Sequence, residues 1–442
     1  MEKTKRHGPK ELPFIGSGKR FGKDPLQFLE EIYQEFGDVV EYTLLGTPFI
    51  AVYNPEYIEH ILTKNSANYV KSIFVRERWE PFFGNGVITA VGEDWKLSRK
   101  ALQPFVSRDK ISTYFEIFER ESLNYLSTLK PGKVIDIKND MMNLMLYSLV
   151  KILFHSELED KKIKQFGELF EECVHYFNYT MEPAGIIFKN FPTPTKRRFQ
   201  KALTGLENLI QDVLKNVDTS DVNMFSKLIN SKDDNGNPTF TPKLIRDNLL
   251  SFFIAGHETS SLSICYTLFL LAQHPEEMKR VQAELDTVLK GKIPTFEDLD
   301  KLHAIKNVIN ESMRLYPPVG IMGREAVGED QIGRFKINKG TNIVFPILSI
   351  HRSKHFYDKP LEFLPDRWES INLHAKRNEF LPFGTGPRVC MGASFAMMEI
   401  TTVIAILLQR YSFKLLSSPD LKLASSVSMR PLNDMHLEVL ER

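Results

Sequence analysis

The sequence predicts a mainly helical protein with small β-sheets. Helical periodicity of apolar side chains dominates the 442 residues. The longest such pattern, residues 244–272, corresponds to a helix of roughly 43 Å at the usual rise per residue. A helix of that length crosses an entire domain. Residues 38–53 instead alternate in polarity and turn at a glycine, as expected of a β-hairpin.

The remaining elements follow the same two periodicities. A further helix is expected from residue 274 onward, and short strands are expected near 334–346 and 421–439. Other helices are expected at residues 111–129, 139–154, 160–178, 195–216, 303–315 and 391–409. No repeat, low-complexity block or long linker divides the sequence. We therefore predict a single domain over residues 1–442, with a small β-rich portion at about 35–70 and a helical portion for most of the rest.

Composition excludes several classes of protein. The 57 lysines and arginines nearly equal the 56 aspartates and glutamates, so no global basic field points to nucleic acid. Three scattered cysteines are too few for a disulfide framework or a zinc cluster. The charged, proline-broken start does not resemble a signal peptide, and the longest apolar run is interrupted by His257 and Glu258. These features predict a soluble, cytoplasmic protein with no transmembrane anchor in this chain.

The segment FLPFGTGPRVCMG, residues 380–392, places one cysteine among glycines just ahead of a predicted helix. A lone cysteine is most often an inert, buried thiol. Here Gly384 and Gly386 permit unusual backbone conformations, and a helix start favours a thiolate at Cys390. A desolvated thiolate needs a positive partner, and no nearby cysteine or histidine completes a zinc site. One axial thiolate to a haem iron fits better.

The stretch Phe383–Gly392 resembles the haem-binding loop of the cytochrome P-450 family. All five fixed positions of that pattern match: Phe383, Gly386, Arg388, Cys390 and Gly392. The resemblance implies the cytochrome P-450 fold and a haem b cofactor, iron protoporphyrin IX, with Cys390 as the metal ligand. Phe383, Arg388 and Gly392 would belong to the same cofactor-binding loop.

A second motif is Glu311 followed three residues later by Arg314, in NVINESMRLYPP. Residues three apart are neighbours on a helix, so the two side chains can pair. An isolated pair of this kind is most often an ordinary surface ion pair. The family resemblance instead implies that Arg367, in PDRW, joins both in a buried cluster that braces the cysteine loop. Asp366 is a mild departure, since the family often has glutamate there.

The long helix carries a third motif, Ala255-Gly256-His257-Glu258-Thr259. Glycine beside a charge is unfavourable in an apolar helix, which suggests function rather than stability. The Thr259 hydroxyl can donate to the carbonyl of Ala255, and Gly256 permits a local kink. By resemblance, this groove faces bound oxygen, and Glu258 and Thr259 relay protons to it. His257 is expected to be a packing or hydrogen-bonding residue.

Trp95 and Arg99 lie four residues apart and share one helical face. Two anionic haem propionates inside a protein require donors such as an indole N–H and a guanidinium. By resemblance, Trp95, Arg99, Arg324 and Arg388 would hold the propionates. His351 is one further candidate donor.

Together, these matches imply a haem-thiolate monooxygenase, which inserts one oxygen atom from O2 into a lipophilic organic substrate. Electrons would come from a separate donor, such as a ferredoxin, a flavodoxin or a reductase. Basic side chains within residues 96–110 could dock that donor, although such charge runs are more often simply solvated. Candidates for the substrate pocket, again by resemblance, are Phe74, Phe82, Phe83, Val319, Ile321, Val427 and Met429.

Several other functions were compared with monooxygenation. A haem-thiolate isomerase or dehydratase, and a peroxygenase, need no external electrons, but the intact Glu258 and Thr259 pair argues against both. A non-catalytic haem sensor would need no proton relay. A dinucleotide-binding dehydrogenase fails because the glycines near residue 384 do not follow the G-x-G-x-x-G spacing.

Overall fold

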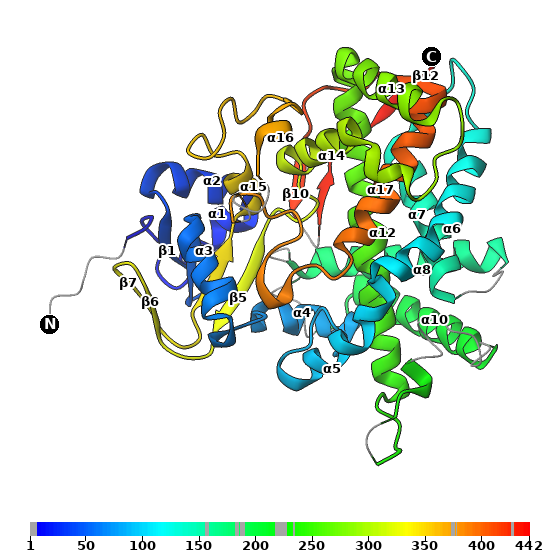
Figure 1. Ribbon diagram of the computed structural model, residues 1–442. Helices are drawn as coiled ribbons and strands as arrows, with labels where there is room; N and C mark the ends of the chain where they lie inside the picture. Colours follow the sequence, from blue (N-terminus) through cyan, green and yellow to red (C-terminus); the bar gives the residue numbers. More distant parts are fainter. Residues whose placement is uncertain are drawn as a thin grey trace, which may run out of the picture. The chain divides into compact units, whose positions relative to one another are not determined.

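The computed structural model describes residues 7–154, 159–181, 185, 191–216, 228–232, 235–372, 376, 378–425 and 428–442. It divides into two compact units (Figure 1). The first unit contains Met1–Arg76, Asn310–Met391 and Leu421–Leu432, and the second contains Glu77–Ile309, Gly392–Asp420 and Asn433–Arg442. Each unit combines separate stretches of the chain. A single domain over residues 1–442 stays a prediction.

The first unit is built on a five-stranded sheet of order β1-β2-β8-β5-β3. Its β1–β2 hairpin confirms the alternation at residues 38–53, with Leu44 opposite Thr47. The two turn residues, Leu45 and Gly46, both have positive φ (50° and 80°). Positive φ at both positions suits the twist of a two-residue hairpin loop. Helix α2 packs against this hairpin, and buried side chains of both form the apolar core of the unit.

The first unit contains most of the short elements. Its strands are β1 (Val39–Leu44), β2 (Thr47–Val52), β3 (Tyr69–Val70), β5 (Met322–Ala326), β6 (Asp330–Ile332), β7 (Phe335–Ile337), β8 (Asn342–Phe345), β10 (Leu423–Ser425) and β11 (Met429–Pro431). Its helices are α1 (Gly18–Lys23), α2 (Pro25–Phe36), α3 (Pro55–Glu59), α15 (Ile347–His351), α16 (Arg367–Ser370), the π-helix η1 (His60–Lys64) and the 3-10 helices η2 (Ser66–Asn68) and η5 (Gly386–Arg388).

The second unit is mostly helical, and its helix α12 packs against α7 and α17 (Figure 1). Its helices are α5 (Gly92–Leu102), η3 (Gln103–Val106), α6 (Arg108–Ser127), α7 (Ile137–Phe154), α8 (Asp160–Met181), α10 (Pro194–Asn216), α12 (Pro242–Gln273), α13 (Pro275–Leu289), η4 (Asp298–Lys301) and α17 (Ala393–Arg410). One small sheet has the order β4-β12-β9, with β4 (Val134–Asp136), β9 (Tyr411–Leu415) and β12 (His436–Glu441). The unit boundary falls within α4 (Ile73–Phe83) and α14 (His303–Leu315).

Helix α12 matches the helix predicted at residues 244–272. It begins where Thr241 caps the N-terminus, with its hydroxyl accepting from the N–H of Leu244 at 3.2 Å, and Pro242 occupies the first helical position. It ends at Gln273, with His274 as the C-cap directly before Pro275. Most of its side chains are buried, as expected of a helix that is apolar on all sides. The mainly helical fold class is confirmed.

The helices within residues 18–36, 55–64 and 73–102 were not predicted. Helices α1 and α3 are too short to show a helical period. Helix α4 contains Pro81, and the sequence of α5, GEDWKLSRKAL, is largely polar. Periodicity of apolar residues therefore carried no signal for α1, α3, α4 and α5. Helix α2 was missed although its buried residues, Phe28, Leu29, Ile32 and Tyr33, recur at helical spacing.

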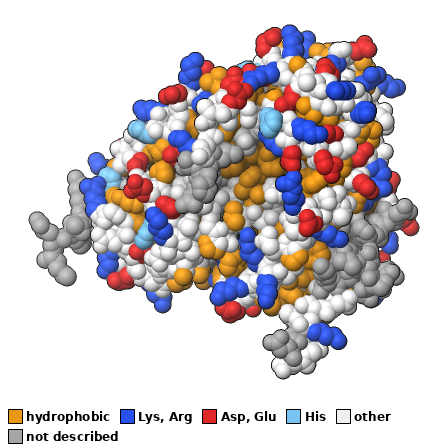
Figure 2. Space-filling model, in the orientation of Figure 1, with side chains coloured by type: hydrophobic (Ala, Val, Ile, Leu, Met, Phe, Trp, Pro, Cys, Tyr) orange, Lys and Arg blue, Asp and Glu red, His pale blue; other side chains and the backbone are white. Residues whose placement is uncertain are grey.

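The surface shows the charge balance expected from composition. Figure 2 shows lysine and arginine side chains interspersed with aspartate and glutamate over the face in view. Among the described residues, one helix, Ala393–Arg410, is long and apolar enough to cross a membrane. Within the protein, 67% of that helix is buried, which is typical of a core helix.

Candidate active site

Cys390 lies at the end of a loop that is closed by a backbone hydrogen bond. The N–H of Cys390 donates to the carbonyl of Phe383 at 2.9 Å. Gly384 and Gly386 have φ of 70° and 74°, a region that side chains disfavour. A Cβ at residue 386 would lie 1.8 Å from the carbonyl oxygen of Leu62, in η1. Gly386 is therefore required by both the turn and the close approach of η1.

The side chain of Cys390 is exposed, whereas Cys173 and Cys265 are buried. Burial raises the pKa of the Cys173 thiol to about 12, so this group stays protonated. Helix α17 begins at Ala393 with Gly392 as its N-cap, three residues after Cys390. An exposed thiol is accessible to a ligand, while the two buried thiols act as packing groups.

Glu311 and Arg314 form a buried ion pair on α14. Arg314 donates from Nε to Glu311 Oε2 at 2.9 Å and from Nη2 to Oε1 at 2.8 Å. Arg367 adds a hydrogen bond from Nε to Oε1 at 3.0 Å, so the structure brings the three predicted residues together. The N–H of Leu364 and the indole N–H of Trp368 also donate to this carboxylate, each at 2.9 Å. These five hydrogen bonds compensate for the removal of the carboxylate from water.

His351 links this cluster to the cysteine loop. Its carbonyl accepts from Arg314 Nη1 at 2.9 Å, and its imidazole Nε2 lies 2.7 Å from the backbone nitrogen of Leu381. Nδ1 lies 3.3 Å from the carbonyl oxygen of Met313. Because the Leu381 N–H is a donor, Nε2 is the acceptor and Nδ1 carries the proton. Both ring nitrogens therefore serve backbone groups, and the expectation that His351 is a propionate donor is corrected.

Ala255 and Thr259 lie on an open stretch of an otherwise buried helix. Ala255 is exposed and Thr259 is partly exposed, whereas most of α12 is buried. The Thr259 hydroxyl donates to the carbonyl of Ala255 at 2.5 Å, as expected. Since this bond uses its only proton, Oγ1 can offer just its lone pairs to a further partner. Glu258 is 1% exposed, so its carboxyl is kept from bulk water.

Gly256 and His257 pack toward α7. A Cβ at Gly256 would lie 3.1 Å from Leu149, so a side chain there would press on α7. His257 Nε2 lies 2.9 Å from the carbonyl oxygen of Met142, also on α7. Its ring stacks on that of Phe253, with centroids 5.2 Å apart. His257 is a packing and hydrogen-bonding residue, as predicted.

One buried acid was not predicted from the sequence. Glu399, on α17, is fully buried, and its Oε1 accepts a hydrogen bond from the hydroxyl of Ser260, on α12. Burial raises the pKa of Glu399 well above its ordinary value, which favours the protonated carboxyl. The lone acid inside the apolar run FAMMEITTVIAILL is the sequence signal that could have indicated this role.

Three cations of the first unit influence one another. Burial, Arg324 and Arg388 lower the pKa of Lys71 to about 7, and burial lowers that of Arg324 to about 10. Both arginines were predicted from the sequence, whereas Lys71, which belongs to no motif, was not. Like charges held together favour an anionic ligand. The other two predicted propionate donors, Trp95 and Arg99, are partly buried on α5 in the second unit.

Two predicted pocket residues, Phe82 and Phe83, are buried in the second unit. Their ring centroids lie 4.5 Å apart. Phe82 also contacts Phe170 of α8 and Phe199 of α10, with centroids 5.5 and 6.5 Å away. These rings belong to an aromatic cluster that joins α4, α8 and α10.

The remaining described pocket candidates lie in the first unit. Val319 and Ile321 are partly buried, and Met429 is buried. The N–H of Met429 donates to the carbonyl of Pro318 at 2.7 Å, and a Cβ at Gly320 would lie 2.2 Å from the Met429 sulfur. Residues 318–321 and Met429 therefore lie together. Val427 and the side chain of Phe74 lie outside the described residues.

Comparison with known proteins decides the family. A model of the family described as Cytochrome P450 matches residues 7–437. The chain belongs to the cytochrome P450 family. Similar proteins include cyclooctat-9-en-7-ol 5-monooxygenase of Streptomyces melanosporofaciens, 28% identical over 415 residues, or 92% of this chain and 89% of that protein. Pentalenene oxygenase of Streptomyces avermitilis is 28% identical over 91% of this chain and 90% of its own length. Chloroplastic carotene epsilon-monooxygenase of Arabidopsis thaliana is 28% identical over 92% and 80%.

Membership of the cytochrome P450 family confirms the resemblance drawn from the sequence. The cofactor is haem, and the protein is an oxidoreductase of the monooxygenase class. The residues present fit this cofactor. An exposed thiol at Cys390 suits an iron ligand, and the mutual repulsion among Lys71, Arg324 and Arg388 suits the carboxylates of haem.

Proposed function

We propose that Cys390 is the thiolate ligand of the haem iron, and that this cytochrome P450 inserts one atom of O2 into a lipophilic organic substrate. The observation that carries the proposal is the loop around Cys390. The Cys390 thiol is exposed, and the Cys390 N–H closes the loop by a hydrogen bond to the carbonyl of Phe383. His351 accepts a hydrogen bond at the start of the loop and is itself hydrogen-bonded to Arg314. A loop braced in this way holds the sulfur in one place, as a metal ligand requires.

When bound, haem with a thiolate ligand supplies O–O cleavage and C–H oxidation. Residues of α12 would control the protons. The Thr259 hydroxyl, which donates a hydrogen bond to the carbonyl of Ala255, could accept a hydrogen bond at Oγ1, and rotation of the hydroxyl would let it donate to another partner. Glu258, the next residue and a buried acid, would supply the proton that the hydroxyl passes on.

Cationic and N–H donor side chains would hold the haem propionates. Lys71, Arg324 and Arg388 supply three cations, and Trp95 and Arg99 supply N–H donors on α5. A carboxylate among the three cations would relieve the repulsion that lowers the pKa of Lys71. Phe383 and Gly392 belong to this proposal as parts of the cysteine loop.

The substrate class rests on the relatives and on apolar side chains. The relatives are named for cyclooctat-9-en-7-ol, pentalenene and carotene, which consist mostly of hydrocarbon. The apolar side chains proposed to contact the substrate are Phe82, Phe83, Val319, Ile321 and Met429, with Phe74 and Val427 retained from the sequence. The electron donor is proposed to be a separate ferredoxin, flavodoxin or reductase. A soluble, cytoplasmic location stays a prediction from composition.

The absorption spectrum of the reduced protein with carbon monoxide tests the iron ligand. A thiolate ligand gives a red-shifted Soret band. Cys390→Ser should abolish that band, whereas Cys173→Ser, which changes a buried packing thiol, should retain it. An imidazole-type band in the unaltered protein would overturn the assignment of Cys390.

Turnover assays test the reaction. Product formation that requires NAD(P)H and an added electron donor separates monooxygenation from peroxygenase, isomerase, dehydratase and sensor functions. Thr259→Ala should lower product per NAD(P)H by about tenfold or more, with hydrogen peroxide released instead, because general acid catalysis is lost. Thr259→Ser keeps the hydroxyl and should keep most of the coupling. Unchanged coupling in Thr259→Ala would overturn the relay.

A further inference from the structure

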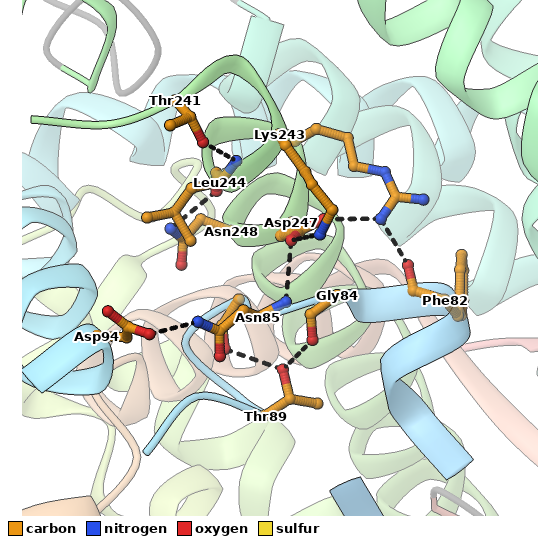
Figure 3. Close-up of polar contacts among 12 residues, drawn as sticks. Phe82, Gly84, Asn85, Thr89, Asp94, Thr241, Lys243, Leu244, Asp247 and Asn248 are labelled. Atoms are coloured by element: carbon orange, nitrogen blue, oxygen red, sulfur yellow. Dashed lines mark hydrogen bonds and ion pairs between the residues drawn. The ribbon is translucent and has the colours of Figure 1, made fainter. Parts of the chain in front are cut away.

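The loop between α4 and α5 is held by two adjacent side chains of α12. The N–H of Asn85 donates to Asp247 Oδ2 at 2.9 Å (Figure 3), and the N–H of Val87 donates to Asn248 Oδ1, also at 2.9 Å. Asp247 and Asn248 are 1% and 0% exposed. Two alternate amides of one loop are therefore satisfied by a buried acid and a buried amide near the start of the long helix.

Two glycines bring the backbone of this loop onto α12. A Cβ at Gly84 would lie 2.0 Å from Asp247 Oδ2, and a Cβ at Gly86 would lie 2.2 Å from the hydroxyl of Ser251. The Thr89 hydroxyl donates to the carbonyls of both glycines, at 2.8 and 3.1 Å. The loop is thus folded on itself and seated directly on the helix. Neither glycine position leaves room for a side chain.

Asn248 also forms a hydrogen bond with α5. Nδ2 of Asn248 donates to the hydroxyl of Ser98 at 3.2 Å and to the carbonyl of Leu244 at 3.0 Å. Ser98 is fully buried. It lies between Trp95 and Arg99, so the side chain that Asn248 holds is on the helix that carries both predicted propionate donors. A hydrogen bond at this position fixes the rotation of α5 about its own axis.

The charge of Asp247 is balanced from both sides. Lys243 Nζ lies 3.0 Å from Oδ2, and Arg246 Nη1 lies 2.8 Å from Oδ1. Arg246 also donates to the carbonyl of Phe82 at 3.0 Å, so the hydrogen bonds around Asp247 extend to the last turn of α4 (Figure 3). The side chain of Lys243 is 75% exposed, so its ion pair contributes little, whereas the bonds to the loop are buried.

We infer that Asp247 and Asn248 are positioning residues, which set the place of α5, and with it of Trp95 and Arg99, on α12. The inference rests on the proposed function, in which these two side chains hold the haem propionates. Asp247 precedes Ala255 by eight residues, or about 12 Å along a helix. Helix α12 therefore carries both the residues that contact the α4–α5 loop and α5, and the segment that is proposed to transfer protons.

The test compares Asn248→Ala and Ser98→Ala with the matched control Lys243→Met, in the full-length holoprotein. The control removes an exposed partner of Asp247 and leaves both bonds to the loop. The first measurement is amide hydrogen exchange of peptides that cover residues 84–102. The second is the rate at which haem passes to an excess of apomyoglobin. Urea midpoints of all variants are recorded as a measure of global stability.

Loss of one buried hydrogen bond changes an equilibrium by about three- to tenfold. Asn248→Ala loses the bonds to both Val87 and Ser98, and should therefore speed both exchange at residues 84–90 and haem transfer by about tenfold. Ser98→Ala should speed haem transfer by about threefold at an unchanged urea midpoint, without faster exchange at residues 84–87. Lys243→Met should stay within about twofold of the unaltered protein in both measurements.

Two results would overturn the inference. One is unchanged exchange at residues 84–90 in Asn248→Ala. The other is faster exchange with an unchanged rate of haem transfer, because the loop would then be anchored without any effect on the donors of α5. If Asn248→Ala does not fold, Ser98→Ala decides, and an unchanged rate of haem transfer counts against the inference.

Reference variants separate this inference from the proposed function. Trp95→Phe and Arg99→Met should speed haem transfer while exchange at residues 84–87 stays unchanged. If both leave haem transfer unchanged, the proposed propionate roles fail. If both speed it but Ser98→Ala and Asn248→Ala do not, the positioning role fails and the propionate roles stand.

Discussion

His351 and Leu381 are joined by a hydrogen bond from the Leu381 N–H to the imidazole Nε2, at 2.7 Å. His351 is 0% exposed, and burial lowers its pKa to about 3, with neighbouring arginines adding to the effect. The carbonyl of Leu381 accepts in turn from the N–H of Gly384 at 3.1 Å. A ring that is buried in its neutral form thus supports the start of the loop that ends at Cys390.

This bond predicts an acid-dependent loss of stability. The unfolded chain protonates His351 near its ordinary pKa of about 6.5, while the folded protein resists protonation down to about 3. The contribution is therefore complete above pH 6.5 and falls by about 1.4 kcal/mol per pH unit below it. Urea unfolding at about pH 7.5, 6.5, 5.5 and 4.5, which starts above the affected window and covers its upper part, should show this slope.

His351→Gln provides the comparison. Glutamine does not titrate, and its Oε1 can accept from the Leu381 N–H. The unfolding free energy of the variant should therefore lack the part of the slope that histidine contributes. Equal slopes in the two proteins would show that His351 does not titrate between the folded and unfolded states as its burial implies.

The long elements of the fold could be predicted from sequence because they bury apolar side chains with a regular period. Helix α12 differs from its predicted bounds by two residues at the start and one at the end. Helix α5 could not be predicted in this way, since Ser98 and Leu102 are its only buried residues among those described. Its buried Ser98 accepts a hydrogen bond from Asn248, which is 150 residues away in the chain.

The candidate site was predictable where chemistry fixes a local spacing. The cysteine loop and the Glu311 and Arg314 pair are of this kind. Trp368, Lys71 and Glu399 were missed because their roles arise from contacts with distant segments. Trp368 donates to a carboxylate 57 residues earlier, and nothing in its own neighbourhood indicates that partner.

Removal of the Glu311 charge should destabilise the first unit. In Glu311→Gln, Arg314 and Arg367 would remain buried with their countercharge lost, which costs about 3–5 kcal/mol. Urea unfolding and the yield of the red-shifted carbon monoxide band should both decrease. Glu362→Gln is the matched control, because its carboxylate pairs with Lys359 at 3.3 Å on the surface. It should cost less than about 1 kcal/mol.

Trp368→Phe is a smaller change to the same cluster. It keeps an aromatic ring against Phe380, whose centroid lies 4.4 Å away, and removes a single N–H donor to Glu311. The expected loss is about 1–3 kcal/mol in urea unfolding at neutral pH. A neutral effect would mean that the remaining donors satisfy the carboxylate without the indole.

The lowered pKa of Lys71 predicts that the protein takes up protons when haem binds. Burial, Arg324 and Arg388 lower its pKa to about 7 in the chain alone. Propionate carboxylates would raise that pKa, so haem binding at pH 8 should take up part of a proton. Calorimetry of haem binding in two buffers with different ionisation enthalpies measures the uptake. Lys71→Met should abolish it, and Lys64→Met, which changes an exposed lysine, should not.

Glu399 predicts the opposite pH dependence to that of His351. Its folded pKa is raised by burial, so the carboxyl contributes stability that is complete below about pH 4.5 and is lost as pH rises toward the folded pKa. Glutamine keeps an acceptor for the Ser260 hydroxyl and carries no ionisation cost. Glu399→Gln should therefore gain stability over the unaltered protein in urea unfolding at about pH 8, and should show no such gain at about pH 5. Glu276→Gln, whose side chain is 86% exposed, should show no pH-dependent difference. If Glu399→Gln loses the same stability at both pH values, the carboxyl is not held protonated, and its bond to Ser260 stabilises the packing of α12 on α17 in the ionised form.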